Sequence, residues 1–310
     1  MGKFWWQNQP LTISAIQKHV EEGSEKAFDE YVSKSFFNVE QLKHLFSTGG
    51  GMTCYEDDVW GETLEEYLKK SRPTGIREII YTNTHCLSPE ISSAHPEYWE
   101  RNKDGEPLYG YGIYKFACIN PSGDFHKKLL KELTALSYRD IDGIFLDGPI
   151  MSEKGCYCEN CQKGFEESFG HSIFQSTERE RLIYRVDIST QHMKEIYEAV
   201  KAINPNIAVY LNNSALRPDV TGSNTRKLYE YTDLLGAEGG FHGPFMGAGN
   251  IWQMSAFLKQ LEGIIGDPIK EKKPYVNFFN PNEASRPEYL HTPLETKLSY
   301  AHTLAAGANV

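Results

Sequence analysis

The chain has 310 residues, a formal net charge of −10, and 40% hydrophobic residues. This length suits one α/β barrel, and the apolar content is enough for a large core. The acidic balance and the lack of a basic run exclude a nucleic-acid surface, which needs cationic patches, and no apolar stretch is long enough to cross a membrane.

Strand-like runs alternate with helical patterns along the chain. The predicted strands cover residues 11–16, 50–55, 77–83, 143–147, 207–212, 233–238, 274–279 and 308–310. The clearest predicted helices cover residues 63–70, 125–137, 178–203 and 250–261, and the third stops before Asn204-Pro205. This alternation predicts a parallel sheet, and eight strands favour an α/β fold of the (β/α)8 TIM barrel type over a doubly wound sheet.

The two ends of the chain carry further expectations. The N-terminal segment MGKFWWQNQP has no apolar signal core, so we expect a cytoplasmic protein. The last predicted strand, at residues 308–310, is shorter than a closed barrel needs. We therefore interpret residues 1–310 as a single barrel that is truncated in strand eight, and we expect a further C-terminal part.

Acidic side chains follow two predicted strands of the barrel. In this fold the chemistry sits at the C-terminal ends of the strands. Asp147 ends the strand at 143–147, and Glu238 ends the strand at 233–238. The simpler interpretations are that Asp147 caps the next loop and that Glu238 is a surface acid. Two carboxylates facing each other across a barrel mouth are the pattern of glycoside hydrolysis, in which one is ionised and the other holds a proton.

Other polar and aromatic residues near the predicted strand ends are candidates to bind sugar hydroxyls or a ring face. Aromatic residues make up 13% of the chain, which suits sugar binding as well as ordinary core packing. A lone histidine at a strand end is often structural, and an acid before a predicted helix often caps it. The candidates are Asp57, Trp60, Asn83, His85, Asn212, His242 and Asn280.

Three cysteines in a CxCxxC pattern follow Asp147 by nine residues. Cys156, Cys158 and Cys161 supply three soft ligands on one loop, and a closed zinc site needs a fourth. Cys118 is the best fourth ligand because it lies just before the fourth strand unit, and Cys86 is the next candidate. We predict a structural zinc ion in a loop at about 154–162. The alternative is a set of free thiols in a reducing cytoplasm.

The sequence resembles glycoside hydrolase family 42, the β-galactosidases with a zinc loop. The resemblance rests on an acid at the end of strand four, nine residues before CxCxxC, and on an upstream cysteine in FACINPSGDF. DGIFLDGP followed by CYCENCQKGF resembles still more a group of hypothetical glycosyl hydrolase barrels that are related to the α-L-fucosidases of family 29. These resemblances imply a TIM barrel that acts on a carbohydrate.

The residue at the end of strand four departs from the family 42 pattern. That family has Asn-Glu there, with the Glu as acid/base, whereas this chain has Leu146-Asp147. A lone Asp resembles the nucleophile of fucosidase-like barrels. The resemblance therefore implies that Asp147 is the nucleophile. With Glu238, at the end of the strand at 233–238, as the proposed acid/base, we expect a retaining glycosidase. A non-catalytic carbohydrate-binding barrel, a hydrolase that uses the cysteine-bound zinc, and a homo-oligomer remain open.

Overall fold

The structure is a computed structural model. It describes residues 3–7, 10–14, 29, 37–42, 58–110, 112–212, 218–238, 253–266, 273–278, 282–283, 286–290 and 292–310, and for residues 58–63, 238, 253–254, 265, 278, 282–283 and 286–290 it describes the backbone alone.

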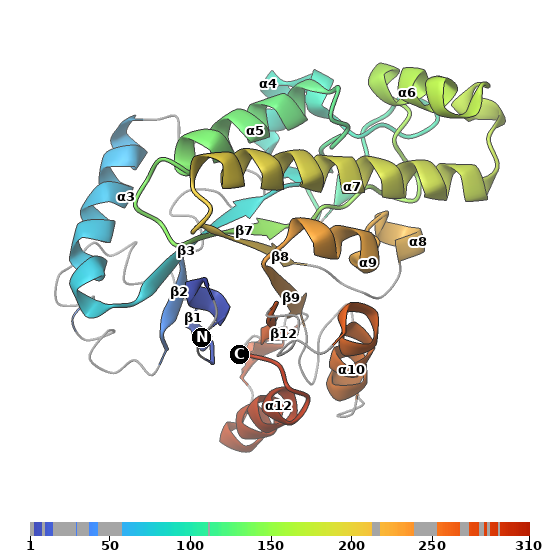
Figure 1. The fold of residues 1–310 in the computed structure, drawn as a ribbon. Helices are drawn as coiled ribbons and strands as arrows, with labels where there is room; N and C mark the ends of the chain where they lie inside the picture. The colour runs from blue at the N-terminus through green and yellow to red at the C-terminus, as the bar shows by residue number, and fades with distance from the viewer. Residues whose placement is uncertain are drawn as a thin grey trace.

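A seven-stranded parallel sheet curls into a barrel (Figure 1). Its strands, in spatial order, are β1 (Ile13–Ser14), β2 (Val39–Leu42), β3 (Arg77–Asn83), β7 (Gly143–Asp147), β8 (Ala208–Asn212), β9 (Leu234–Glu238) and β10 (Tyr275–Phe278). All six pairings between neighbours are parallel. The sequence prediction of a TIM barrel is therefore confirmed.

Residues 308–310 lie in the position of the eighth strand, between β10 and β1. Asn309 donates its backbone N–H to the Tyr275 carbonyl (2.9 Å) and accepts from the backbone N–H of Asn277 (2.8 Å). On the other side, Val310 exchanges backbone hydrogen bonds with Leu11 (3.2 Å) and Ile13 (2.6 Å). Residues 308–310 therefore pair with both neighbouring strands, in the place of an eighth strand.

Helices cover the outside of the barrel (Figure 1). The main ones are α3 (Asp58–Ser71), α5 (Asp124–Leu136), α7 (Glu178–Ile203), α10 (Gln253–Ile265) and α12 (Pro293–Ala305). Shorter helices are α4 (Pro89–Ala94), α6 (Glu159–Phe169), α8 (Pro218–Thr221) and α9 (Thr225–Leu228), with 3-10 turns η1 (Trp5–Gln7), η3 (Arg72–Thr74), η4 (Pro96–Tyr98), η5 (Ile173–Gln175) and η6 (Tyr229–Tyr231). In the described part of the chain, no helix has the length and apolar character to span a bilayer.

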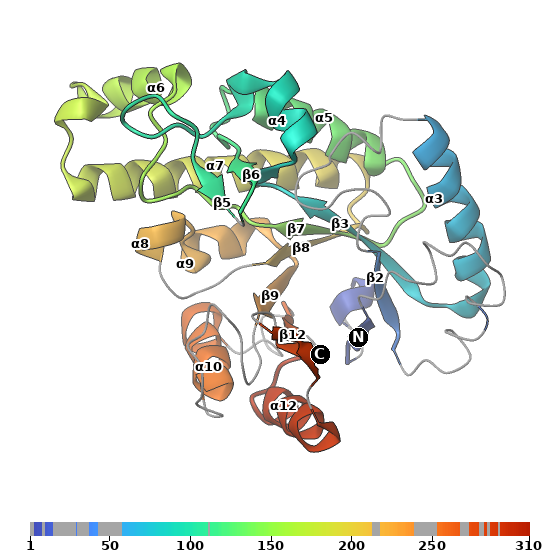
Figure 2. The same cartoon turned by 180° about the vertical axis from the view of Figure 1, so that it is seen from behind.

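Two small antiparallel sheets extend loops that follow barrel strands. The first joins β4 (Cys86–Leu87), β6 (Tyr114–Phe116) and β5 (Tyr109–Gly110), and it lies close to α4 (Figure 2). The second pairs β11 (Asn282–Glu283) with β12 (Arg286–Leu290). Because the first sheet connects β3 to α5, it belongs to the loops at the C-terminal ends of the barrel strands.

Both faces of the barrel strands are buried, as expected for a parallel sheet under helices. Alternate residues along each strand face opposite sides. One set fills the barrel interior: Val39, Ile79, Phe145, Tyr210, Leu234 and Val276. The other set packs in the larger cluster beneath the helices: Leu42, Ile80, Ile144, Leu146, Val209, Leu211 and Leu235. Because both faces of each strand are buried, the strands appear in the sequence as continuous apolar runs.

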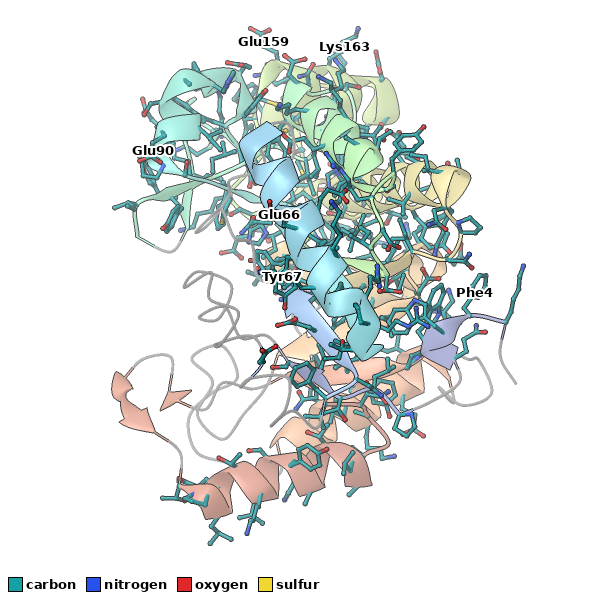
Figure 3. All side chains as sticks on the ribbon, turned by 90° about the vertical axis from the view of Figure 1, so that its left-hand side faces the viewer. Phe4, Glu66, Tyr67, Glu90, Glu159 and Lys163 are labelled. Atoms are coloured by element: carbon teal, nitrogen blue, oxygen red, sulfur yellow. The ribbon has the colours of Figure 1, made fainter. Side chains whose placement is uncertain are left out.

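The second strand differs from the one predicted. The structure places β2 at Val39–Leu42, and the predicted strand at 50–55 lies outside the described residues. The run VEQL was missed because Glu40 and Gln41 break its apolar character, although both side chains are buried. Tyr67 lies on α3 (Figure 3), and its hydroxyl donates a hydrogen bond to the buried side chain of Glu40.

Candidate active site

A row of polar residues lies at the C-terminal ends of β3, β7 and β8. Asn83, Asp147 and Asn212 are paired across these three strands, and Gly236 on β9 continues the row. The pairing follows from the parallel register, which brings the carboxyl ends of neighbouring strands to one edge of the barrel. Asp147, half-buried, is the carboxylate in this row.

The Asp147 carboxylate accepts a hydrogen bond on each oxygen. Asn212 donates from Nδ2 to Oδ1 at 2.8 Å, and the Tyr81 hydroxyl donates to Oδ2. Burial, and then the charge of Asp147, raise the pKa of Tyr81, so its hydroxyl keeps the proton that it donates. The Tyr81 ring also stacks on Phe145 inside the barrel, with ring centroids 5.4 Å apart. These contacts fix the carboxylate as an acceptor at the barrel mouth.

The backbone carbonyl of Asp147 is held by the loop that follows β3. Thr84 donates to it from its backbone N–H (3.0 Å) and from its hydroxyl (2.7 Å), and His85 Nδ1 lies 2.8 Å from it. His85 is buried, and this burial lowers its pKa, so the neutral ring serves as the donor. Gly148 has φ of +119°, and a Cβ there would lie 2.3 Å from the Thr84 hydroxyl. Only glycine fits this close approach.

The sugar-binding residues predicted from the sequence fall into four groups. Asn212 lies beside Asp147. Asn83 and His85 are buried, and the Asn83 amide oxygen accepts from the backbone N–H groups of His85 (3.0 Å) and Cys86 (2.8 Å), which shapes the turn. The backbone of Trp60 lies in the first turn of α3 rather than at a strand end. Asp57, His242 and Asn280 lie outside the described residues.

Glu238 is described by its backbone only. It is the last residue of β9 and pairs with Phe278 on β10. On the same strand, Gly236 pairs with Asn212, so Glu238 lies two positions beyond the row that contains Asp147. Its assignment as acid/base stays a prediction.

Four cysteines meet in the loop region after β7. The Sγ atoms of Cys118, Cys156, Cys158 and Cys161 all lie within 4.8 Å of one another. Cys118 Sγ is 3.6 Å from both Cys158 Sγ and Cys161 Sγ. A zinc ion with four sulfur ligands at about 2.3 Å places them about 3.8 Å apart in a tetrahedron. The geometry therefore fits a zinc ion, and the fourth cysteine is Cys118 rather than Cys86.

Surrounding groups support metal ligation by this cluster. The Arg101 backbone N–H donates to Cys156 Sγ (3.4 Å), and the Asn120 side chain donates to Cys161 Sγ (3.5 Å). Hydrogen bonds from the other three thiols lower the pKa of Cys158, and burial raises the pKa of Cys156. Four thiolates brought together in this buried site would need a cation to compensate their charge. With four sulfur ligands the coordination is closed, which is typical of a structural site.

The segment between Asp147 and the cysteines is fastened to the rest of the protein. The buried Arg185 on α7 donates to the carbonyls of Met151 (2.9 Å), Val220 (3.1 Å) and Asp219 (2.6 Å). The Ser152 backbone N–H donates to a side-chain oxygen of Glu100 at 2.8 Å. The sequence alone did not point to Tyr81, Glu100 or Arg185. Of these three, only Tyr81 could have been found from the sequence, because it lies two residues before Asn83 on the same face of a predicted strand.

Comparison with solved structures finds glycosidases with the same fold. An α-L-fucosidase isoenzyme 2 from Paenibacillus thiaminolyticus superposes with a TM-score of 0.71 at 17% identity, covering 97% of this chain and 45% of that one. A GH42 β-galactosidase from G. stearothermophilus gives 0.68 at 14%, covering 96% and 50%. The PgaB (BpsB) glycoside hydrolase domain from Bordetella bronchiseptica gives 0.67 at 10%, covering 97% and 92%.

The chain spans about half the length of the fucosidase and the β-galactosidase. No family sequence model matches it, and no curated protein matches it in sequence. At these identities the likeness concerns the fold. The chain is thus a (β/α)8 barrel related in structure to the glycosidases that its sequence resembles.

Proposed function

We propose that this protein is a glycoside hydrolase in which Asp147 is the nucleophile. The observation that carries the proposal is the position and bonding of one carboxylate. Asp147 ends the fourth strand of a (β/α)8 barrel, where this fold holds its chemistry, and both of its oxygens accept hydrogen bonds, from Tyr81 and Asn212. Donors on both oxygens suit an ionised carboxylate that attacks, rather than an acid that must give a proton.

The rest of the proposed site follows from the sequence prediction. Glu238 on β9 would act as acid/base, and the mechanism would be retaining if the two carboxyl groups lie about 5 to 5.5 Å apart. The cysteine cluster would hold a structural zinc ion that fixes the loop after Asp147. The substrate would be a carbohydrate, and we place the protein in the cytoplasm, where thiols stay reduced. Closed coordination by four sulfur atoms disfavours the alternative of a zinc-dependent hydrolase.

A panel of nitrophenyl glycosides tests the proposal. We expect Asp147→Asn to abolish hydrolysis while the fold is kept, because the amide has the same shape and cannot form the glycosyl ester. Tyr81→Phe removes one hydrogen bond to a charged group, worth roughly 1.5–3 kcal/mol, so the rate should fall about 10- to 150-fold. A fully active Asp147→Asn variant would refute the assignment.

Azide distinguishes the roles of the two acids. Glu238→Ala should harm substrates with poor leaving groups most, since activated aryl glycosides need little protonation. Added azide should then restore turnover and give a glycosyl azide of retained configuration. If azide instead rescues an Asp147→Ala variant with retained configuration, Asp147 is the acid/base. Sugar binding without hydrolysis of any substrate would favour a carbohydrate-binding barrel.

A further inference from the structure

Helix α12 contacts the barrel through small and polar side chains. Ser299, Thr303 and Ala306 are buried against it. Asn277 on β10 donates from Nδ2 to the Thr303 hydroxyl at 2.9 Å, and the Tyr275 hydroxyl donates to the Ala306 carbonyl at 2.7 Å. The inner face of α12 is therefore attached by hydrogen bonds and close packing, without large apolar residues.

The outer face of α12 carries the large apolar residues instead. Leu294 is 65% exposed and Leu298 is 37% exposed, and Ala301 and Ala305 are exposed as well. A surface helix normally turns its apolar stripe toward the core. Here the stripe faces away from it, and side chains of α12 project outward at the edge of the molecule (Figure 3).

Four of the exposed residues of α12 have the spacing of a helix-pairing seam, and the exposed Tyr300 (37%) and Leu304 (51%) lie to one side of it. Leu294, Leu298, Ala301 and Ala305 follow one another at intervals of four, three and four residues, which is the a/d pattern of paired helices. The row of four residues also complements itself when a second copy of the helix lies antiparallel to the first. A two-fold axis between residues 299 and 300 sets Leu294 opposite Ala305 of a second copy, and Leu298 opposite Ala301. Each large side chain then meets a small one, so the helices can approach to about 8 Å.

We propose that α12 is a dimerisation surface that pairs antiparallel with α12 of a second copy of this chain. An isologous interface requires one surface to complement itself, and the leucine-to-alanine arrangement meets this requirement. With 13 residues, α12 is about 20 Å long. One helix pair of this length buries less than the roughly 1,200 Å² of a standard interface. The dimer is therefore expected to be weak, with exchange between monomer and dimer at micromolar concentrations.

Sedimentation velocity over a range of micromolar concentrations tests the surface. We expect the wild-type protein to dimerise and Leu298→Lys to stay monomeric, because a lysine ammonium would be buried in the seam. The matched control is Ile113→Lys, which changes a residue of similar character that is 65% exposed between β5 and β6. This control should dimerise as the wild type does. The melting temperatures of both variants should match that of the wild type.

Cross-linking tests the antiparallel register. Leu294→Cys combined with Ala305→Cys should give a disulfide-linked dimer, whereas each single variant should not. Positions 294 and 305 are about 16 Å apart along one helix, so only antiparallel pairing brings the Cα atoms within the roughly 4.4–6.8 Å that a disulfide needs. The unmodified protein gives the background from its own six cysteines.

Three results would overturn the proposal. The first is a wild-type monomer at all concentrations, and the second is a dimer that Leu298→Lys leaves unchanged. The third is a Leu298→Lys variant that melts well below the wild type. That result would mean that Leu298 stabilises the fold of a single chain and does not serve a dimer contact. None of these outcomes depends on glycosidase activity.

Discussion

Glu100 lies fully buried beside the loop that links Asp147 to the cysteine cluster. The Ser152 backbone N–H donates to one of its oxygens at 2.8 Å, and burial raises the pKa of Glu100 from 4.5 to about 8, although the nearby Arg185 opposes this shift. The folded protein therefore keeps a proton on Glu100 that the unfolded chain has lost. At 1.36 kcal/mol per pKa unit, this difference amounts to about 5 kcal/mol of stability.

The free energy of unfolding depends on pH because the folded and unfolded states bind different numbers of protons at Glu100. Between about pH 4.5 and pH 8 the folded state binds one proton more than the unfolded state, so stability falls as the pH rises. Above about pH 8 the whole contribution is lost. Glu100→Gln keeps the acceptor for Ser152 and has no proton to lose. We expect this variant to match the wild type near pH 4 and to exceed it by several kcal/mol at pH 9.

Urea unfolding followed by circular dichroism at pH 5, 7 and 9 measures this effect. The control is Glu90→Gln, because Glu90 is exposed on α4 and its change should alter stability by less than about 1 kcal/mol at any pH. If the stability difference between Glu100→Gln and the wild type is the same at pH 5 and pH 9, the reasoning about buried Glu100 is wrong.

Two more predictions concern the same region. Elemental analysis should find about one zinc ion per chain. Cys158→Ser should lose this zinc and Cys86→Ser should keep it, because only Cys158 belongs to the proposed four-sulfur site. A metal-free protein with full stability would contradict this prediction. Arg185→Ala leaves three carbonyls without their donor and should cost about 3 kcal/mol or more. It should therefore lower the melting temperature by roughly 5 °C or more, whereas Arg179→Ala, at an exposed position in the first turn of α7, should change it little.

Local sequence patterns predicted those parts of the protein that depend on local physics. Apolar runs gave β3 and β7 with the bounds that the structure has. The helix at Glu178–Ile203 was also predicted with its bounds, and a capping box at Thr177 and Glu180 begins it. The cysteine spacing predicted the cysteine cluster because three of its members lie within six residues, and Cys118 was expected as the fourth from its place just before the strand at 143–147.

Features that depend on distant partners were not predictable. Glu40 interrupts the apolar pattern of β2, so this strand was not predicted. Nothing near Glu40 in the sequence indicates that Tyr67 contacts its side chain. Glu100 and Arg185 have no motif, and their roles arise because β7, α7 and the segment after β4 converge. Asn83 and His85 lie at and just beyond the end of a strand, as predicted, but their hydrogen bonds are directed into the turn and toward the Asp147 carbonyl.

The pairing of residues 308–310 with Leu11 and Ile13 has a consequence for biosynthesis. A ribosome adds roughly 5–20 residues per second, so about 15 to 60 seconds separate the synthesis of β1 from that of the segment that closes the barrel against it. During this interval β1 is an unpaired edge that another chain can join. Only two residues of β1 form its ladder, and this shortness limits the surface that a nascent chain exposes to its neighbours on the same messenger RNA.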